Sequence, residues 1–348
     1  MITVVSGILV GALFGFSLQR GRFCMNSAFR DIIVGRDFNL VKAVGVALLV
    51  ETLGFSIMAM TGVIKMAPPA LMWGAEGVGG LLFGMGMVLA GGCASGITYR
   101  AGEGLVGAFS AIVGFSLFAL TTSAGVLSPV ANFLKTNTKI SAADGSPLTL
   151  GNIFGINANI VGLVLSVVII AVWVVLALRK RTEEEPGEKP KSIWEAIFKK
   201  GWSWPAAGIA VGLVGVLAFP LSAATGRNYP LGITAGWNNI WQTLFVPGTV
   251  MNWGGALIIG IVLGSLVGAA IAGELALRAP APKVLVQAFI GGSLMGFGAT
   301  VAGGCNVGHV LSGVPQLSIG SMFDTFMIIA GCWIMAYFLF IRPMNAAR

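Results

Sequence analysis

Charged residues are scarce in this sequence. They make up 10% of its 348 positions, whereas hydrophobic residues make up 56%. A soluble domain carries about 25% charged residues, so this chain could not cover a surface exposed to water. The lipid bilayer must therefore be the solvent for most of its outside. The net charge of +8 then reflects membrane orientation, and we expect no nucleic-acid partner.

Histidine and paired cysteines are also lacking. The only histidine is His309, and none of the four cysteines forms a CxxC pair. This argues against a disulfide framework, a zinc site and a thioredoxin-like motif. The methionines and cysteines do not cluster at close spacing, which disfavours a soft-metal transporter. We therefore expect neither a metal nor a cofactor. The cysteines are Cys24, Cys93, Cys305 and Cys332.

Long apolar stretches are what the sequence has in abundance. Nine of them are about long enough for a membrane helix, which needs roughly 20 residues. We predict an all-α integral membrane protein with about nine transmembrane helices. The first stretch lacks a basic start and a clean cleavage site, so we expect a retained helix and not a signal peptide. The stretches are approximately 2–19, 40–62, 76–92, 104–127, 159–179, 204–221, 253–273, 284–303 and 320–341.

Two polar segments interrupt this pattern. We expect residues 128–158 to be a loop and residues 180–200 to be a linker between two halves. The predicted organisation is thus a first half, a central part with the polar loop, the fifth helix and the linker, and a second half. Their bounds are 1–127, 128–203 and 204–348.

Lysine and arginine are distributed unevenly between the predicted loops. In membrane proteins these residues mark the cytoplasmic side. If nine helices alternate, one side holds most of them. The bias predicts a cell inner-membrane protein with its N-terminus outside and its C-terminus in the cytoplasm. The other side holds only Lys65, Lys135, Lys139 and Arg227.

A glycine-rich segment that ends near a cysteine occurs twice. Residues 79–96 and 291–308 are identical at ten of eighteen positions, with Cys93 opposite Cys305. Cys24 ends a fainter copy, and the best candidate for a fourth lies at 225–229. The Cys93 copy follows a helix that runs inward, whereas the Cys305 copy follows one that runs outward. The halves should therefore be inverted repeats, which place a substrate site at their interface.

Each of these cysteines follows a predicted backbone break. The pairs Gly91-Gly92 and Gly303-Gly304 suit such a break, with close approach of the backbone to another group. A short helix after the cysteine would direct free N–H groups at the break, and such groups bind anions. Irregular backbone at membrane depth occurs only where it lines a cavity or is buried in protein. We expect short re-entrant helices beside a path for a small anion.

The thiols of Cys24, Cys93 and Cys305 are the candidate pathway groups. A protonated thiol is a weak, soft hydrogen-bond donor, and it suits a large, polarizable acceptor such as a terminal sulfur. Free cysteine also serves as a small buried hydrophobic residue. We assign that role to Cys332, which has no repeat partner and no break beside it.

Three polar residues just past the thiols are supporting candidates. Asn26, Asn306 and His309 can donate hydrogen bonds to oxyanion oxygens. For His309, an interfacial structural role fits equally well.

The remaining candidates are charged. Arg22 and Arg100 flank the cysteines on the cytoplasmic side, where they could bind an anion, although the positive-inside rule already explains them. Glu51 lies within a span, so it is either a proton site or a structural partner for an arginine.

The cysteine motifs resemble one known family. GRFCMNSAFRD at 21–31, GGCASG at 91–96 and GGCNVGH at 303–309 are similar to the YeeE/YedE family of thiosulfate transporters. The resemblance covers essentially the whole chain. It implies an hourglass-shaped membrane protein that takes up thiosulfate for sulfur assimilation, with three cysteines passing the ion along by S–H···S contacts. These match Cys24, Cys93 and Cys305. It also implies a TusA-like cytoplasmic sulfurtransferase as a partner.

Two alternatives stay open. Members near YedE are linked to selenium compounds, so a selenium compound or another sulfur oxyanion is the alternative substrate. A membrane thiol enzyme that transfers sulfur would need a resolving cysteine and a base within reach. The sequence offers no CxxC and a single histidine, so we expect a transporter and not an enzyme.

Overall fold

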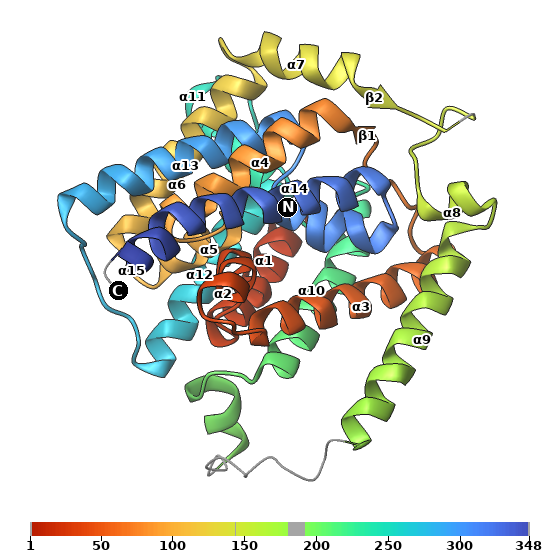
Figure 1. Cartoon of the computed structure of the whole chain (residues 1–348), viewed down its shortest axis with the longest axis horizontal. Helices are drawn as coiled ribbons and strands as arrows, with labels where there is room; N and C mark the ends of the chain where they lie inside the picture. The colour runs from red at the N-terminus through yellow and green to blue at the C-terminus, as the bar shows by residue number, and fades with distance from the viewer. Residues whose placement is uncertain (1, 143, 180–191, 347–348) are drawn as a thin grey trace.

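The computed structural model describes residues 2–142, 144–179 and 192–346, and these are mostly helical (Figure 1). Eight helices within this part are long and apolar enough to cross a membrane, and α9 has a shorter apolar stretch at Ala158–Trp173. This confirms the prediction of an all-α multi-pass membrane protein. The long helices are α1 (Ile2–Arg20), α3 (Asn39–Met60), α4 (Trp73–Ala90), α6 (Val106–Ser123), α9 (Ala158–Arg179), α10 (Trp204–Ala223), α12 (Trp253–Ala272), α13 (Pro282–Ala302) and α14 (Ile319–Ala336).

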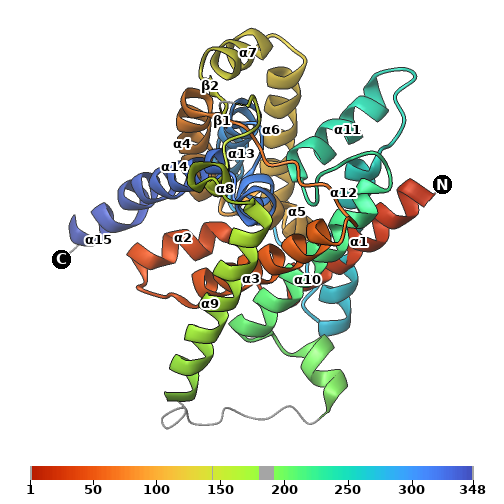
Figure 2. The same ribbon diagram turned by 90° about the vertical axis from the view of Figure 1, so that its right-hand side faces the viewer.

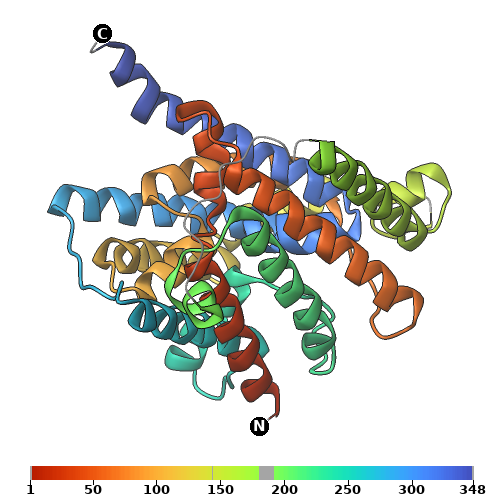
Figure 3. The same ribbon diagram turned by 90° about the horizontal axis from the view of Figure 1, so that it is seen from below.

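Short helices follow four of the long ones after a turn of the chain. Three of them begin directly after, or one residue beyond, a cysteine that the sequence singled out. The fourth follows the segment around 225–229, where the sequence predicted a further break. The four are α2 (Met25–Val34), α5 (Ala94–Gly102), η2 (Val307–Gly313) and α11 (Ile233–Phe245). The two termini lie on opposite sides of the molecule (Figures 2 and 3).

The prediction of a loop at 128–158 is wrong. This segment forms α7 (Ser128–Asn137), β2 (Lys139–Ile140) and α8 (Leu150–Phe154). Strand β2 pairs antiparallel with β1 (Leu71–Met72). Polar composition indicated exposure correctly, but an exposed surface helix needs few apolar residues, and proline in its first turn favours a helix start. Figure 1 shows α7 above the ends of the long helices.

The predicted linker at 180–200 lies partly outside the described residues. Its described end forms η1 (Glu195–Lys199), which leads into α10. The remaining short elements are η3 (Val314–Gln316), η4 (Tyr337–Ile341) and α15 (Arg342–Ala346).

Glycines allow the long helices to pack backbone against backbone. A methyl group at Gly11 or Gly15 of α1 would overlap a carbonyl oxygen of α12, and one at Gly84 of α4 would overlap the Ile328 carbonyl of α14. Only a residue without a side chain fits such contacts, as is common between membrane helices. The principal pairs are α1 with α12, α3 with α10, α4 with α13, α4 with α14 and α6 with α13.

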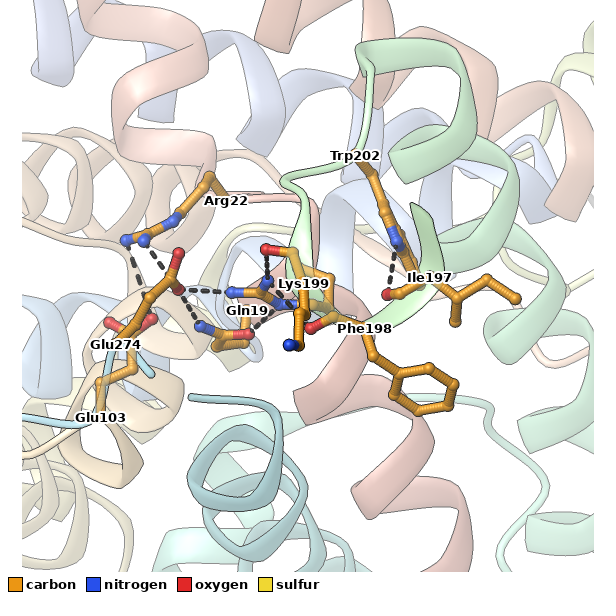
Figure 4. A network of polar contacts seen from close by, with 9 residues as sticks. Gln19, Arg22, Glu103, Ile197, Phe198, Lys199, Trp202 and Glu274 are labelled. Carbon is orange, nitrogen blue, oxygen red and sulfur yellow. Dashed lines mark hydrogen bonds and ion pairs between the residues drawn. The ribbon is translucent and has the colours of Figure 1, made fainter. Parts of the chain in front are cut away.

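A network of charged groups joins the ends of several helices (Figure 4). Arg20, fully buried at the end of α1, pairs with Glu274 and donates to the carbonyl oxygens of Phe198 and Lys199 at 3.3 and 3.0 Å. Arg22 reaches the same Glu274 carboxylate at 2.9 Å. Burial opposes ionisation of this carboxyl, but the two guanidinium groups outweigh it and lower the pKa of Glu274. The network thus fixes η1 to the transmembrane bundle.

We expect Glu274→Gln to lower the free energy of unfolding by about 2–3 kcal/mol, because it leaves the buried Arg20 charge without a carboxylate. The pKa of Glu274 is lower in the folded than in the unfolded protein. Its contribution is therefore complete above its ordinary pKa of about 4.3 and disappears as the pH falls through the lowered value. Denaturant unfolding in detergent at several pH values measures this difference.

The exposed Lys283 offers a control. Lys283→Gln should change stability by less than about 0.5 kcal/mol, as surface substitutions usually do. Equal stabilities of the Glu274→Gln variant and the wild type at neutral pH would contradict the assigned role of the network.

Candidate functional site

Each of the three motif cysteines stands at the start of a short helix. Cys24 and Cys93 immediately precede α2 and α5, and Cys305 precedes the turn that opens η2. In every case the N–H four residues later donates to the cysteine carbonyl oxygen at 2.8–2.9 Å. All three thiols are free and buried. The predicted helix after each cysteine is therefore confirmed.

A left-handed residue forms each break, two positions before the cysteine. Gly91 has φ +70° and Gly303 has φ +92°. Glycine adopts this conformation without steric cost and commonly ends helices in it. The sequence predicted a break at the pairs Gly91-Gly92 and Gly303-Gly304, and in each pair the first glycine takes the left-handed conformation. A methyl group at Gly304 would lie 3.1 Å from Nε2 of His309, so this glycine provides close approach to the ring.

Arg22 takes the left-handed position in the first motif, with φ +46°. Its side chain is 57% exposed and forms ion pairs with Glu274 and, at 3.8 Å, with Glu103. The structure therefore places Arg22 in the charged network and not beside the thiols.

Two of the thiols are neighbours. Sγ of Cys24 lies 3.8 Å from Sγ of Cys93, which also accepts from the Gly96 N–H at 3.3 Å. A methyl group at Gly96 would lie 2.8 Å from Sγ of Cys24 and 3.2 Å from Sγ of Cys93. The first turn of α5 thus approaches both sulfur atoms. The sequence missed Gly96, although the repeat aligns it with Gly308.

Buried amides connect this thiol pair to the Cys305 motif. Asn306 donates from Nδ2 to Sδ of Met25 at 3.1 Å. Asn26 and Asn306 are fully buried, and Nδ2 of Asn26 and Oδ1 of Asn306 have no hydrogen-bond partner among the described residues. The predicted amide donors therefore lie between the motifs. Cys332, interpreted as a buried hydrophobic residue, places its Sγ 3.9 Å from Oδ1 of Asn26.

A cavity of about 230 Å³ borders Cys305. Its cations are Arg227 and Lys135, and Gly303 and Gly304 contribute backbone to its wall. Arg227 donates to the carbonyl oxygens of Tyr229 and Pro230 at 2.8 Å and lies over the Trp253 ring. The break around 225–229 thus places the positive charge of Arg227 at the same cavity as the thiol of Cys305, which follows a different break.

A second cavity, of about 610 Å³, borders the Cys93 break. Gly91 lies in its wall together with three arginines, Arg30, Arg100 and Arg278. Arg100 donates to the carbonyl oxygen of Gly91 and stacks on the Tyr99 ring. The predicted candidate Arg100 is therefore close to the thiol pair, whereas no sequence motif pointed to Arg278.

Glu51 lies apart from the cysteines. It is fully buried where α3 meets α10, in space left by Gly215, and its carboxylate has no hydrogen-bond partner among the described residues. No contact described in the structure joins it to a motif thiol.

Comparison with known proteins identifies the family of this chain. The chain matches the family described as Sulphur transport over residues 20–334. It is 41% identical over 345 residues to the thiosulfate transporter TsuA of Spirochaeta thermophila, across 97% of this chain and 99% of that protein. It is 34% identical over 350 residues to TsuA of Escherichia coli, across 99% and 97%. A stretch of 101 residues is 40% identical to the probable transporter YedE of Escherichia coli, across 28% and 24%.

Gly96→Ala should lower the free energy of unfolding by about 1–2 kcal/mol, because its methyl group would overpack the two sulfur atoms. Gly45→Ala is the matched control in α3, since nothing lies within 4 Å of an added Cβ there. It should be neutral or stabilising by up to about 1 kcal/mol, as alanine favours helix. Denaturant unfolding in detergent compares the two variants, and an equal effect would contradict the packing described for Gly96.

Proposed function

This chain belongs to the Sulphur transport family, and from that premise we propose that it carries thiosulfate into the cell along a path lined by Cys24, Cys93 and Cys305. One observation carries the proposal: the buried Cys305 borders one cavity with an arginine, and the break before the buried Cys93 borders another. The relatives named thiosulfate transporter TsuA cover nearly the whole chain. A transporter function also agrees with the multi-pass helical fold.

The two cavities give the path a direction. By the positive-inside rule, the cavity with Arg30, Arg100 and Arg278 faces the cytoplasm, and the cavity with Arg227 faces outward. We place the protein in the inner membrane with its N-terminus outside. The ion then meets Cys305 first, passes the amides of Asn306 and Asn26, and reaches the thiol pair last.

The chemistry of the path suits thiosulfate. Arginine supplies strong donors for oxyanion oxygens at the two ends. A neutral thiol is a weaker, softer donor, so it binds the terminal sulfur weakly enough to release it. Several weak sites in series permit release as well as binding, which transport requires.

The halves 1–127 and 204–348 are, in this proposal, inverted repeats joined by residues 128–203. Helices α1, α3, α4 and α6 would correspond to α10, α12, α13 and α14. In support, α1 packs on α12 as α10 packs on α3, and α6 packs on α13 as α14 packs on α4. Repeats of this kind place the substrate at their interface.

Sulfur assimilation follows as the cellular role. The arginine-rich inner cavity is much larger than a single small anion needs. It gives a TusA-like cytoplasmic sulfurtransferase, the partner expected from the family resemblance, a place to receive the ion.

Expression of this protein should restore growth on thiosulfate to a strain that lacks other sulfur-uptake routes. Cys93→Ala and Cys305→Ala should abolish that growth, because each removes a thiol of the path. Cys332→Ala is the matched control, a buried cysteine that should leave growth intact. Immunoblots of the membranes show whether each variant is present. Normal growth of the Cys93→Ala strain would remove the thiol path, and growth only on a selenium or other sulfur compound would change the substrate.

Arg227→Gln should raise the KM for thiosulfate about tenfold, the equivalent of about 1.4 kcal/mol, because it removes the half-buried charge of the outer cavity. Uptake of labelled thiosulfate into proteoliposomes measures this. Lys65→Gln removes an exposed charge predicted on the same side and should leave the KM within about twofold, since exposed charges are screened by salt. Equal KM values for the two variants would exclude Arg227 from binding.

A further inference from the structure

Three buried titratable residues lie together behind Cys305. His309 in η2 lies with Nε2 3.8 Å from Oδ2 of Asp324 in α14, and its Nδ1 is 3.1 Å from Oγ of Ser321. Glu76 in α4 is the third member, and it interacts electrostatically with Asp324. Glu76 and Asp324 are fully buried, and His309 is 2% exposed. Neither acid belongs to a cysteine motif.

The two acids face each other across the contact between α4 and α14. A methyl group at Gly320 of α14 would lie 2.6 Å from the Glu76 carboxylate, and one at Gly80 of α4 would lie 2.6 Å from that of Asp324. Each carboxyl thus occupies space left by a glycine of the opposite helix. Glu76 and Gly80 are four residues apart, and so are Gly320 and Asp324. The two acids therefore lie about one helical turn apart along the contact between α4 and α14.

These groups lack the partners that buried charges need. Both oxygens of Glu76, both of Asp324 and Nε2 of His309 have no hydrogen bond within the described chain. The backbone of Met72 approaches Glu76, and that of Ala302 approaches His309, without hydrogen-bond geometry. An ionised carboxylate is costly to bury without a partner, and a bound proton removes this cost for each acid. Buried polar groups are usually hydrogen-bonded, and unlike the equally unpartnered Glu51, these acids lie with His309 behind a motif cysteine.

The cluster also touches the proposed path. The edge of the His309 ring lies against Gly304, which forms the wall of the outer cavity next to Cys305. Other groups that face it are Cys305, Tyr229, whose hydroxyl donates to the Gly308 carbonyl at 2.6 Å, and Lys135 of α7. None of these is a carboxylate, so Asp324 and Glu76 are the acids of this cluster.

We propose that His309, Asp324 and Glu76 form a proton-binding site and that protons bound there enter the cell together with the anion. This inference rests on the proposed transport function. Chains of acidic residues and histidine within a membrane are typical of proton-coupled transporters. The step is a proton transfer alone. The proton binds to the cluster from the outer side, stays there while the anion is beside Cys305, and is then released to the cytoplasm.

Two physical requirements support coupling. Thiosulfate carries two negative charges, and moving them inward opposes a membrane potential that is negative inside. Co-transported protons offset this charge. A dianion beside Gly304 also favours protonation of the cluster, and by reciprocity a protonated cluster favours binding of the dianion.

The test uses proteoliposomes loaded at pH 7.5, with the membrane potential clamped and labelled thiosulfate outside. An inward proton gradient should accelerate wild-type uptake at least about fivefold, the lower range of coupling between ligand sites. Thiosulfate added without a gradient should carry protons inward, seen as acidification of a trapped pH dye. Asp324→Asn should abolish both effects while it retains exchange of internal for external thiosulfate.

Two further variants keep the test decisive. Glu76→Gln probes the cluster where Asp324→Asn fails to fold, and it should likewise make uptake independent of the gradient. Glu51→Gln changes an equally buried, unpartnered carboxyl between α3 and α10, and it should keep the wild-type response.

The outcomes separate the two proposals. Wild-type uptake that ignores a proton gradient, or that follows a sodium gradient instead, overturns the proton site and leaves transport standing. A wild-type response that survives in both cluster variants also overturns the assignment to these residues. Absence of thiosulfate uptake under every gradient overturns the transport function itself.

Discussion

The fold depends on satisfying the backbone hydrogen-bonding groups that become free where a transmembrane helix is broken. Lipid offers no hydrogen bonds to an open backbone, so each break must be enclosed by protein. Four long helices end in such turns, and a short helix follows each. At the start of α5, the Gly96 N–H and the thiols of Cys24 and Cys93 come together because the break places this helix start inside the bundle. The same enclosure that the backbone requires therefore places buried polar groups within an apolar molecule.

Close packing of the long helices makes this enclosure possible. Glycines of α1, α4 and α13 contact carbonyl groups of neighbouring helices directly, which leaves little room for lipid or water between them. The repeated glycines thus have two different tasks: some permit helix contact, whereas Gly91 and Gly303 end a helix in the left-handed conformation. A substitution of a glycine between helices lowers stability because the new side chain overlaps the neighbouring helix. A substitution of Gly91 or Gly303 lowers stability because the left-handed backbone is strained in other residues.

Sequence reasoning reached the helices, the breaks and the cysteines because each leaves a local pattern: long apolar stretches, and a glycine-rich segment repeated with its cysteine in register. It did not predict features that depend on contacts between distant parts of the chain. Nothing local shows that Arg22 takes the left-handed position, that α7 replaces a loop, or that Cys332 lies against Asn26. Glu76 and Asp324 are far apart in the chain, and only the packing of α4 on α14 brings them together.

In the proposed path, the order of polar groups explains how a dianion could be bound and still move. Guanidinium groups stand at the two cavities, where water shares the solvation and weakens their hold. The proposed path between them has buried amides and thiols in place of guanidinium groups, so the ion meets weaker donors where desolvation makes every interaction stronger. A fixed cation at that depth would trap the ion. Buried acids beside the path add adjustable charge instead, since a proton can be bound or released with each passage.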